Sequence, residues 1–378
     1  MVSLKIKMEN LMVVGNTNKI EHVYIHVPFC KRICSYCDFC KMFYNDSLAS
    51  RYLESLEKEF KSFNLSKVKT IYIGGGTPSV LNRNNLIKLF NIIKDIELYS
   101  DYEFTFEMNP DDITEDLLIF LKNNRVNRIS IGIETINEKF YEFLNRYNDS
   151  TLTSKIELVK KYFDTINLDL MYAFPDETID DLKKDLDYVT SFNIDHISIY
   201  SLIIEEHTVL KNKNIKPIDS DIDNEMYYFI IKYLKDKGYN HYEISNFSKD
   251  NKESIHNLCY WNNQQYLGIG LGASGYINNI RYTNTRSINN YLNGKYILEK
   301  EIIDKRIEME YELILGLRKI KGISKTEFFN KFNVQVSDEF DIMELIDNKL
   351  LIENDDYIYI PEDKLYISNN ILINFIGD

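Results

Sequence analysis

Four of the chain's five cysteines lie within eleven residues, in the segment CKRICSYCDFC at 30–40. Cys30, Cys34 and Cys37 follow a C-x3-C-x2-C spacing directly after a predicted strand. Three thiolates on one short loop can bind three irons of a cubane [4Fe–4S] cluster, which leaves the fourth iron open to substrate or cofactor. Because simple electron carriers use four thiolates, the spacing predicts a cluster that binds a further molecule.

Zinc is the alternative metal for this loop. Structural zinc usually draws two separated pairs of Cys or His ligands, and no second pair is present because Cys259 stands alone. Four ligands from residues 30–40 could still hold one zinc ion, so this alternative stays open. An odd number of clustered cysteines argues against a disulfide framework and indicates metal binding or redox chemistry.

The C-x3-C-x2-C pattern, with Tyr36 just before the last cysteine, resembles the radical S-adenosylmethionine (SAM) superfamily. The resemblance implies that SAM chelates the open iron through its amino and carboxylate groups, and that an electron from the cluster cleaves the sulfonium to a 5′-deoxyadenosyl radical. It leaves Cys40 as a neighbour of the cluster, for which a small buried residue is the plain interpretation.

The segments around this loop predict an α/β fold. Short β-branched and aromatic runs alternate with amphipathic stretches at three- and four-residue spacing, which indicates parallel strands joined by right-handed helical crossovers. Six such units predict a partial (β/α)6 barrel. The runs are 22–27, 69–74, 102–107, 127–132, 165–172 and 196–202.

The alternation of strand and helix segments ends after residue 215. A helix is expected to end at Gly238, a polar and aromatic segment follows, and from about 304 two or three helices precede a β-hairpin near 350–368. The predicted division is an N-terminal segment at 1–21, the barrel at 22–215, a middle region at 216–303, and a smaller α+β domain, winged-helix-like at its end, at 304–378.

Ligands of parallel α/β barrels bind at the carboxyl ends of the strands, and the later strands here end in useful groups. Singly, each charged group is more easily explained as a surface or salt-bridge residue; together they form a ring for the amine, carboxylate and ribose of a nucleoside amino acid. The glycines let backbone approach a ligand closely, and Thr77 and Pro78 are expected to open a helix. The groups are Gly74, Gly75, Gly76, Glu107 and Glu134 at strand ends, Arg146 on the helix that follows Glu134, and Asp169 within the fifth strand.

Eight motifs resemble, in order and spacing, the family of oxygen-independent coproporphyrinogen III oxidases and related heme chaperones. They are YIHVPFCKRICSYCDF, IYIGGGTPS, EMNP, RISIGIET, LDLMYAFP, ISIYSLIIEEHT, YEISNF and HNLCYW. The resemblance implies a SAM site lined by Tyr24, Phe39, Gly75, Gly76, Thr77, Glu107, Glu134, Arg146 and Asp169. The family usually has Gln where this chain has Glu134, and an ionised carboxylate loses the bond that the amide would donate.

Three features favour the heme-chaperone group over the oxidases. The oxidases carry a longer N-terminal arm, and they have Cys where this chain has Phe39. The chaperones carry HNxxYW, present here with His256, Tyr260 and Trp261. His256 is then a candidate heme ligand, with a hydrogen-bonded structural histidine as the equal alternative, and Cys259 is a second candidate. The oxidase activity, decarboxylation of coproporphyrinogen III, remains the alternative function, and enzymatic activity is left open.

Composition limits the partners. A formal net charge of −13 without a basic patch argues against nucleic acid. No apolar run approaches the roughly 20 residues of a spanning helix, and the first 20 residues lack a signal-peptide pattern. We expect a cytoplasmic protein that passes heme to apo-proteins of the respiratory chain; peripheral membrane association and homodimerisation stay open.

Overall fold

The computed structural model describes residues 20–377. Its centre is a nine-stranded sheet with the order β11-β1-β4-β5-β6-β7-β8-β10-β9. The six predicted strands are confirmed and pair in parallel in chain order. They are β1 (His22–Val27), β4 (Lys67–Gly75), β5 (Glu97–Met108), β6 (Arg128–Glu134), β7 (Thr165–Tyr172) and β8 (His196–Ser201).

Three further strands extend the sheet beyond the sequence prediction. The strand β11 (Leu267–Ile269) pairs in parallel with β1. At the other edge, β10 (Asn246–Ser248) runs antiparallel to β8 and is followed outward by β9 (Asn240–Glu243). The central sheet is therefore wider than six strands, because segments of the middle region complete both edges.

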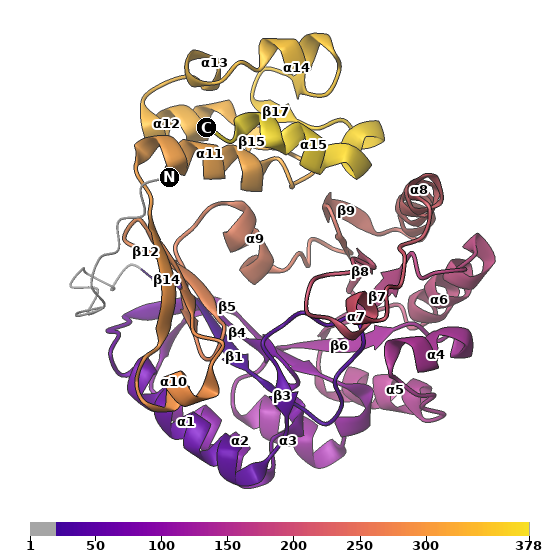
Figure 1. Cartoon of the computed structure of the whole chain (residues 1–378), viewed down its shortest axis with the longest axis vertical. Helices are drawn as coiled ribbons and strands as arrows, with labels where there is room; N and C mark the ends of the chain where they lie inside the picture. The colour runs from indigo at the N-terminus through magenta and orange to yellow at the C-terminus, as the bar shows by residue number, and fades with distance from the viewer. Residues whose placement is uncertain (1–19, 378) are drawn as a thin grey trace.

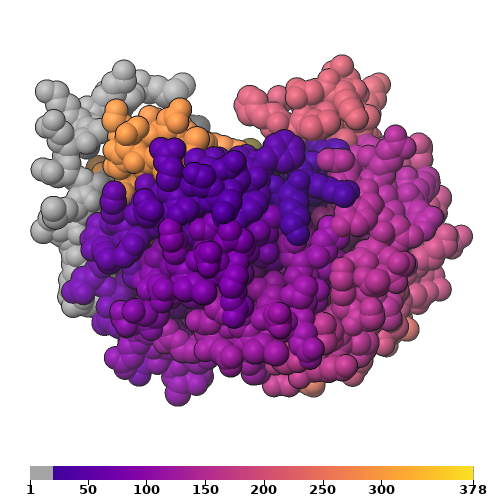
Figure 2. Space-filling view, turned by 90° about the horizontal axis from the view of Figure 1, so that it is seen from below, coloured from indigo at the N-terminus to yellow at the C-terminus, as the bar shows by residue number. Residues whose placement is uncertain are grey.

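Amphipathic helices cover the outer face of the sheet (Figure 1). Seen from below, they form a continuous surface from indigo to magenta (Figure 2). Most begin at an Asn or Thr whose side chain accepts from the first turn, which satisfies an otherwise unpaired backbone N–H. The helices are α1 (Asp46–Phe60), α2 (Arg83–Ile93), α3 (Glu115–Asn123), α4 (Glu138–Leu144), α5 (Leu152–Tyr162) and α6 (Ile179–Ser191).

Alternation along the strands gives the barrel a polar interior. Val23, Ile25 and Val27 of β1 are fully buried in the apolar core with the helices. The residues between them, His22, Tyr24 and His26, point to the opposite face because the side-chain period of a strand is two. The other strands repeat this pattern, so polar groups meet inside the barrel.

The middle region closes the open part of this barrel. The helix α8 (Ser220–Asp236) ends as predicted, with Gly238 in the left-handed region at φ +82°. The short helix α9 (Ile255–Trp261), which carries HNxxYW, packs against β4. The remaining elements are α7 (Val209–Asn212), β12 (Ser274–Ile277), β13 (Ile280–Asn284), α10 (Ile288–Leu292) and β14 (Ile297–Ile302).

The C-terminal part lies above the barrel in Figure 1. The predicted hairpin is present, since β16 (Ile352–Glu353) pairs antiparallel with β17 (Tyr357–Tyr359), and β15 (Ile323–Ser324) completes a small sheet. Four helices rather than two or three precede the hairpin: α11 (Lys305–Gly316), α12 (Lys325–Phe332), α13 (Val336–Glu339) and α14 (Met343–Asp347). The helix α15 (Ser368–Leu372) follows.

The predicted domain boundaries at 215 and 303 stay predictions, and residues 1–19 of the predicted N-terminal segment lie outside the described residues. Within residues 20–377, no helix is long and apolar enough to cross a membrane.

Candidate metal centre and cofactor site

The cysteine loop leaves the carboxyl end of β1 and is closed at its base. Two short parallel strands, β2 (Phe29–Cys30) and β3 (Met42–Phe43), pair with each other. The Met42 N–H donates to the Pro28 carbonyl at 2.7 Å, and the Tyr44 N–H donates to the Cys30 carbonyl at 2.9 Å. The backbone thus returns to its starting point and holds the loop over the strand ends.

Three thiols of this loop lie close together. Burial, with smaller contributions from the neighbouring Cys37 and Cys34, raises the pKa of the Cys30 thiol to about 11. Cys34 and Cys37 are partly exposed and Cys30 is buried, and all three are free thiols. Because a bound metal displaces the thiol protons, three neighbouring thiols, two of them partly exposed, fit a metal centre.

Cys40 lies apart from this trio. Its thiol donates to the Arg286 carbonyl at 3.9 Å, and its side chain packs against Gly272, where an added Cβ would lie 2.5 Å from that of Cys40. The Cys40 carbonyl accepts a hydrogen bond from His26 Nε2 at 2.7 Å. This placement supports the interpretation of Cys40 as a small buried neighbour of the loop.

The glycines at the end of β4 are required by packing, in addition to the ligand contact expected from the sequence. Gly75 has φ +113°, and a Cβ there would meet the His26 ring at 2.5 Å. A Cβ on Gly76 would meet the Phe29 backbone at 2.8 Å. Only glycine fits where the cysteine loop and β4 approach this closely. Thr77 donates to the Cys30 sulfur at 3.7 Å, which joins the glycine loop to the thiol trio.

The predicted helix start at Thr77 is wrong in one respect. Pro78 opens only the 3-10 turn η2 (Pro78–Val80), and Thr77 makes no side-chain cap. The helix α2 begins later, at Arg83, where Asn82 accepts from the first turn. The Thr77 hydroxyl is therefore free to face the cysteines and to accept from Asn109 at 3.2 Å.

Glu107 lies at the centre of the strand ends. Its carboxylate accepts from the Tyr72 hydroxyl at 2.6 Å and from the Gly75 N–H at 3.0 Å. Burial, with a smaller contribution from nearby Asp169, raises the pKa of Glu107 to about 7, although these two hydrogen bonds oppose the rise. The group therefore changes charge near neutral pH, and a cationic or hydrogen-donating ligand would favour its ionised form.

Glu134 and Arg146 form an ion pair beside Cys34. The guanidinium lies 2.7 Å from the Glu134 carboxylate, donates to the Gly132 carbonyl at 2.6 Å, and reaches the Cys34 sulfur at 3.8 Å. The Tyr36 hydroxyl donates to Glu134 at 3.1 Å. Burial raises the pKa of Glu134, and Arg146 opposes that rise. The Glu134 carboxylate is thus neutralised within the chain.

The other predicted cofactor residues lie at different depths of the barrel. Asp169 accepts from Ser130 at 2.7 Å and from Asn167 at 2.8 Å, and burial raises its pKa. The Tyr24 hydroxyl bonds His26 Nδ1 at 2.9 Å. Phe39 is 58% exposed on the outer side of the loop, so it contacts a cofactor only if the cofactor lies against that side.

Of the predicted heme residues on α9, His256 and Tyr260 face into the barrel, and Trp261 lies beside the C-terminal part. His256 is 1% exposed, and both ring nitrogens have partners: Nδ1 bonds Thr70 Oγ1 at 2.7 Å and Nε2 bonds the Tyr260 hydroxyl at 2.7 Å. Trp261 lies 5.8 Å from the Arg318 guanidinium. Cys259 is 1% exposed, and burial raises its thiol pKa. This geometry favours the structural alternative for His256, since iron would have to displace a hydrogen bond.

Sequence reasoning missed several polar residues of the barrel interior: His22, His26, Thr70, Tyr72 and Arg128. They alternate with apolar residues along predicted strands, at HxYxH in β1 and TxY in β4. That alternation indicates a polar inner face, because a strand buried against helices on both faces would be apolar throughout.

The fold and the thiol loop define a protein of the radical SAM class, and the sequence comparisons agree. The family model for the radical SAM superfamily matches residues 24–189. Among solved structures, coproporphyrinogen III oxidase (HemN) from Escherichia coli, described as a radical SAM enzyme, superposes with a TM-score of 0.83. That likeness covers 94% of this chain and 90% of the other at 20% sequence identity, so it supports the fold alone.

Curated relatives give the narrower family. The heme chaperone HemW of Lactococcus lactis is 38% identical over 95% of this chain and 98% of its own length. That of Bacillus subtilis is 34% identical over 95% of this chain and its full length, and that of Escherichia coli is 28% identical over 94% and 98%. The chain belongs to the HemW family.

Proposed function

We propose that this chain is a heme chaperone that binds heme, a [4Fe–4S] cluster and SAM, and that delivers heme to apo-proteins. The observation that carries the proposal is similarity over nearly the whole chain to proteins named heme chaperone HemW. We expect cytoplasmic location and respiratory-chain recipients.

In this proposal Cys30, Cys34 and Cys37 bind three irons. The proximity of their thiols on one closed loop supports this assignment. The bound cluster supplies an open iron that chelates SAM and an electron that can cleave its sulfonium.

The chain's own groups hold the cofactor in place. Glu107 accepts from the amine of SAM, the Gly75–Gly76 backbone lies along it, and Asp169 accepts from a ribose hydroxyl. Arg146 keeps Glu134 ionised and places a cation beside Cys34. Tyr24, Thr77 and Phe39 complete the proposed lining. These roles follow the family resemblance, and the contacts among the groups are compatible with them.

Three measurements on anaerobically purified protein test the proposal. Iron and acid-labile sulfide analysis should give about four of each per chain, whereas zinc without sulfide would establish the zinc alternative. Hemin titration should give a saturable Soret band, and the loaded chain should transfer that band to an apo-form of a respiratory heme protein.

The same preparation separates the chaperone from the oxidase. Incubation with coproporphyrinogen III, SAM and a reductant should yield no protoporphyrinogen, and the control is an authentic coproporphyrinogen oxidase in the same mixture. Formation of protoporphyrinogen by this chain would assign the oxidase activity instead.

A further inference from the structure

A second group of metal-binding side chains lies at the amino end of β1, whereas the cysteine loop leaves its carboxyl end. The group consists of His22 on β1 and of His256 and Cys259 on α9. One nitrogen of each ring and the Cys259 sulfur lie within 4.8 Å of one another. All three side chains are buried, with exposed fractions of 6%, 1% and 1%. Imidazole nitrogen and thiolate sulfur are ligands that zinc prefers in proteins.

The fold brings these three groups together from distant parts of the sequence. His256 and Cys259 are three residues apart on one helix, so their side chains lie on the same face of α9. The helix packs against β4, and Thr70 of β4 is the register partner of His22. The Thr70 hydroxyl bonds His22 Nδ1 at 2.8 Å and His256 Nδ1 at 2.7 Å, and this contact holds the two rings near each other.

The spacing of the three groups suits a metal ion after a small closing movement. Zinc lies about 2.0–2.1 Å from an imidazole nitrogen and about 2.3 Å from a thiolate sulfur, which puts neighbouring ligand atoms roughly 3.3–3.8 Å apart. Side-chain rotations that close the group by about 1 Å are therefore sufficient. Zinc would replace one hydrogen bond of His256, and the other ring nitrogen would keep Thr70 or Tyr260 as its partner. Metal-bound histidines are held in this manner.

The charges around the group fit a divalent cation. A zinc ion bound to one thiolate keeps a single positive charge, and a buried charge needs a partner. The Glu103 carboxylate is this partner, because it lies close to Cys259 and accepts from two backbone N–H groups of α9 at 2.9 and 3.0 Å. Arg128 also faces His256, but Asp169 lies near Arg128 and offsets its charge.

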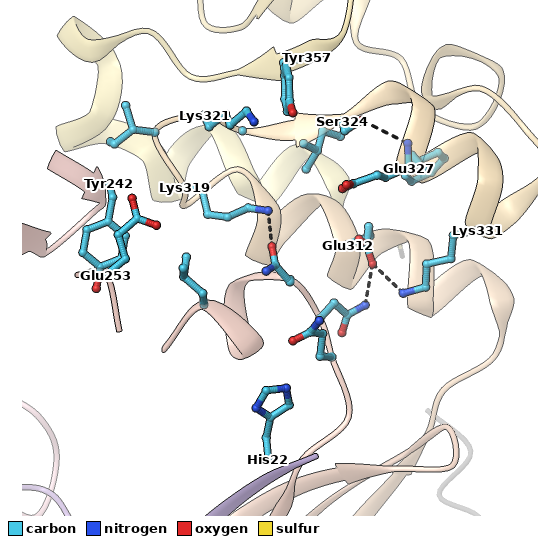
Figure 3. Close-up of a pocket in the computed structure, with 18 of the residues that line it drawn as sticks. His22, Tyr242, Glu253, Glu312, Lys319, Lys321, Ser324, Glu327, Lys331 and Tyr357 are labelled. Carbon is cyan, nitrogen blue, oxygen red and sulfur yellow. Dashed lines mark hydrogen bonds and ion pairs between the residues drawn. The ribbon is translucent and has the colours of Figure 1, made fainter. Parts of the chain in front are cut away.

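A large cavity between the barrel and the C-terminal part gives a metal ion access to the group. Its volume is about 1120 Å³, and His22 points into it from the start of β1 (Figure 3). Gln264, which bonds His22, also lines it. Among the described residues of the lining, five glutamates outnumber three lysines, and Lys331 is paired with Glu308 and Glu312. This excess of negative charge favours the entry of cations.

We propose that His22, His256 and Cys259 bind one zinc ion, with a water molecule or the Gln264 side chain from the cavity as the fourth ligand. Binding releases the Cys259 thiol proton to solvent and involves no change of oxidation state. The ion joins α9 of the middle region to β1, the strand that leads into the cysteine loop. The inference does not depend on the proposed function, because none of the three ligands belongs to the cysteine loop.

The first test is metal analysis of cluster-loaded protein that has been incubated anaerobically with zinc sulfate and dialysed against zinc-free buffer. About one zinc ion per chain should remain beside the iron. X-ray absorption at the zinc edge is not affected by the iron, and it should show about one sulfur and three nitrogen or oxygen neighbours. No retained zinc, zinc without a sulfur neighbour, or zinc bound by three or four sulfurs of the cysteine loop would overturn the assignment.

Variants of the ligands locate the ion. Loss of an outer partner of a metal ligand costs about 10–100-fold in affinity, so Cys259→Ala and His22→Gln should each weaken zinc binding by at least about 100-fold. Their iron and sulfide contents should stay at the wild-type level. The matched controls are Cys40→Ala, which removes another buried thiol, and His241→Asn, since His241 lines the same cavity. Both controls should retain zinc. Wild-type zinc affinity in His22→Gln would overturn the site even if Cys259→Ala does not fold.

The structural role of the ion has its own readout. An ion that binds only the folded chain stabilises it, so removal of zinc should lower the urea midpoint of the wild type and leave that of Cys259→Ala unchanged. Equal wild-type midpoints with and without zinc would overturn the join between α9 and β1. A chain that binds hemin without retaining zinc refutes this inference alone, and one that retains zinc without binding hemin refutes only the proposed function.

Discussion

Glu107 gives the sharpest prediction for the proposed SAM site, because its buried carboxyl changes charge in the range of ordinary assays. With a pKa of about 7, it is about nine-tenths ionised at pH 8 and about one-tenth ionised at pH 6. The groups facing it are the Tyr72 hydroxyl, the Gly75 N–H, Asp169 and Arg128. In the proposed SAM site a protonated carboxyl would accept poorly from the cofactor's amine, so SAM affinity should fall as the pH falls.

The variant Glu107→Gln supplies the reference, since it keeps the shape and cannot ionise. The amino group of SAM also titrates, near the ordinary α-amino pKa of about 7.7–8.0, but equally for both proteins. The ratio of wild-type to variant affinity isolates Glu107. That ratio should fall about tenfold between pH 8 and pH 6, or about 1.4 kcal/mol.

The assay is anaerobic calorimetric titration of SAM into cluster-loaded protein at pH 6, 7 and 8 and constant ionic strength. Nearby His26 does not confuse the result, because burial lowers its pKa to about 4. A ratio that stays constant from pH 6 to pH 8 would show that Glu107 is not the ionised partner of the cofactor.

The loop and its surroundings give three further predictions. Cys40→Ala should retain the iron and sulfide content of the wild type, whereas Cys34→Ala should lose it; equal losses would make Cys40 a ligand. Gly75→Ala should lower the unfolding free energy in urea by at least about 1–3 kcal/mol, since alanine is strained at φ +113°. Arg146→Ala should cost about 3–5 kcal/mol by leaving Glu134 buried without its cation, and adding Glu134→Gln should recover part of that loss; no recovery would disprove the pairing.

The barrel strands could be predicted because their signal is local. The alternation over 22–27 and 165–172 fixes both the strand and its inward face, and the observed bounds match those runs. The strand β11 could not be found in this way. It has three residues, too few for a period, and it pairs with β1 from more than two hundred residues away, so tertiary packing alone creates it.

In the site, too, some features have a local sequence signal and others depend on tertiary packing. The spacing of Cys30, Cys34 and Cys37 predicts a shared metal because all three lie on one loop. The ion pair of Glu134 and Arg146 joins a strand end to the residues after α4, and nothing in the spacing says that these two groups meet. The sequence identified both residues, but their mutual neutralisation depends on how α4 returns to the sheet.

His256 of the HNxxYW motif, on the helix α9, links polar groups that lie toward both ends of the barrel. The His256 ring lies 5.2 Å from the Tyr72 ring, and Tyr72 donates to Glu107 on the cluster side. The same His256 bonds Thr70, which bonds His22 at the amino end of β1. A residue that touched only heme would need exposure, and His256 has almost none. His256 is buried between the Tyr72 side and the Thr70 side of the barrel. Because both of its ring nitrogens have partners, the ring can hold the neighbours on each side in one orientation.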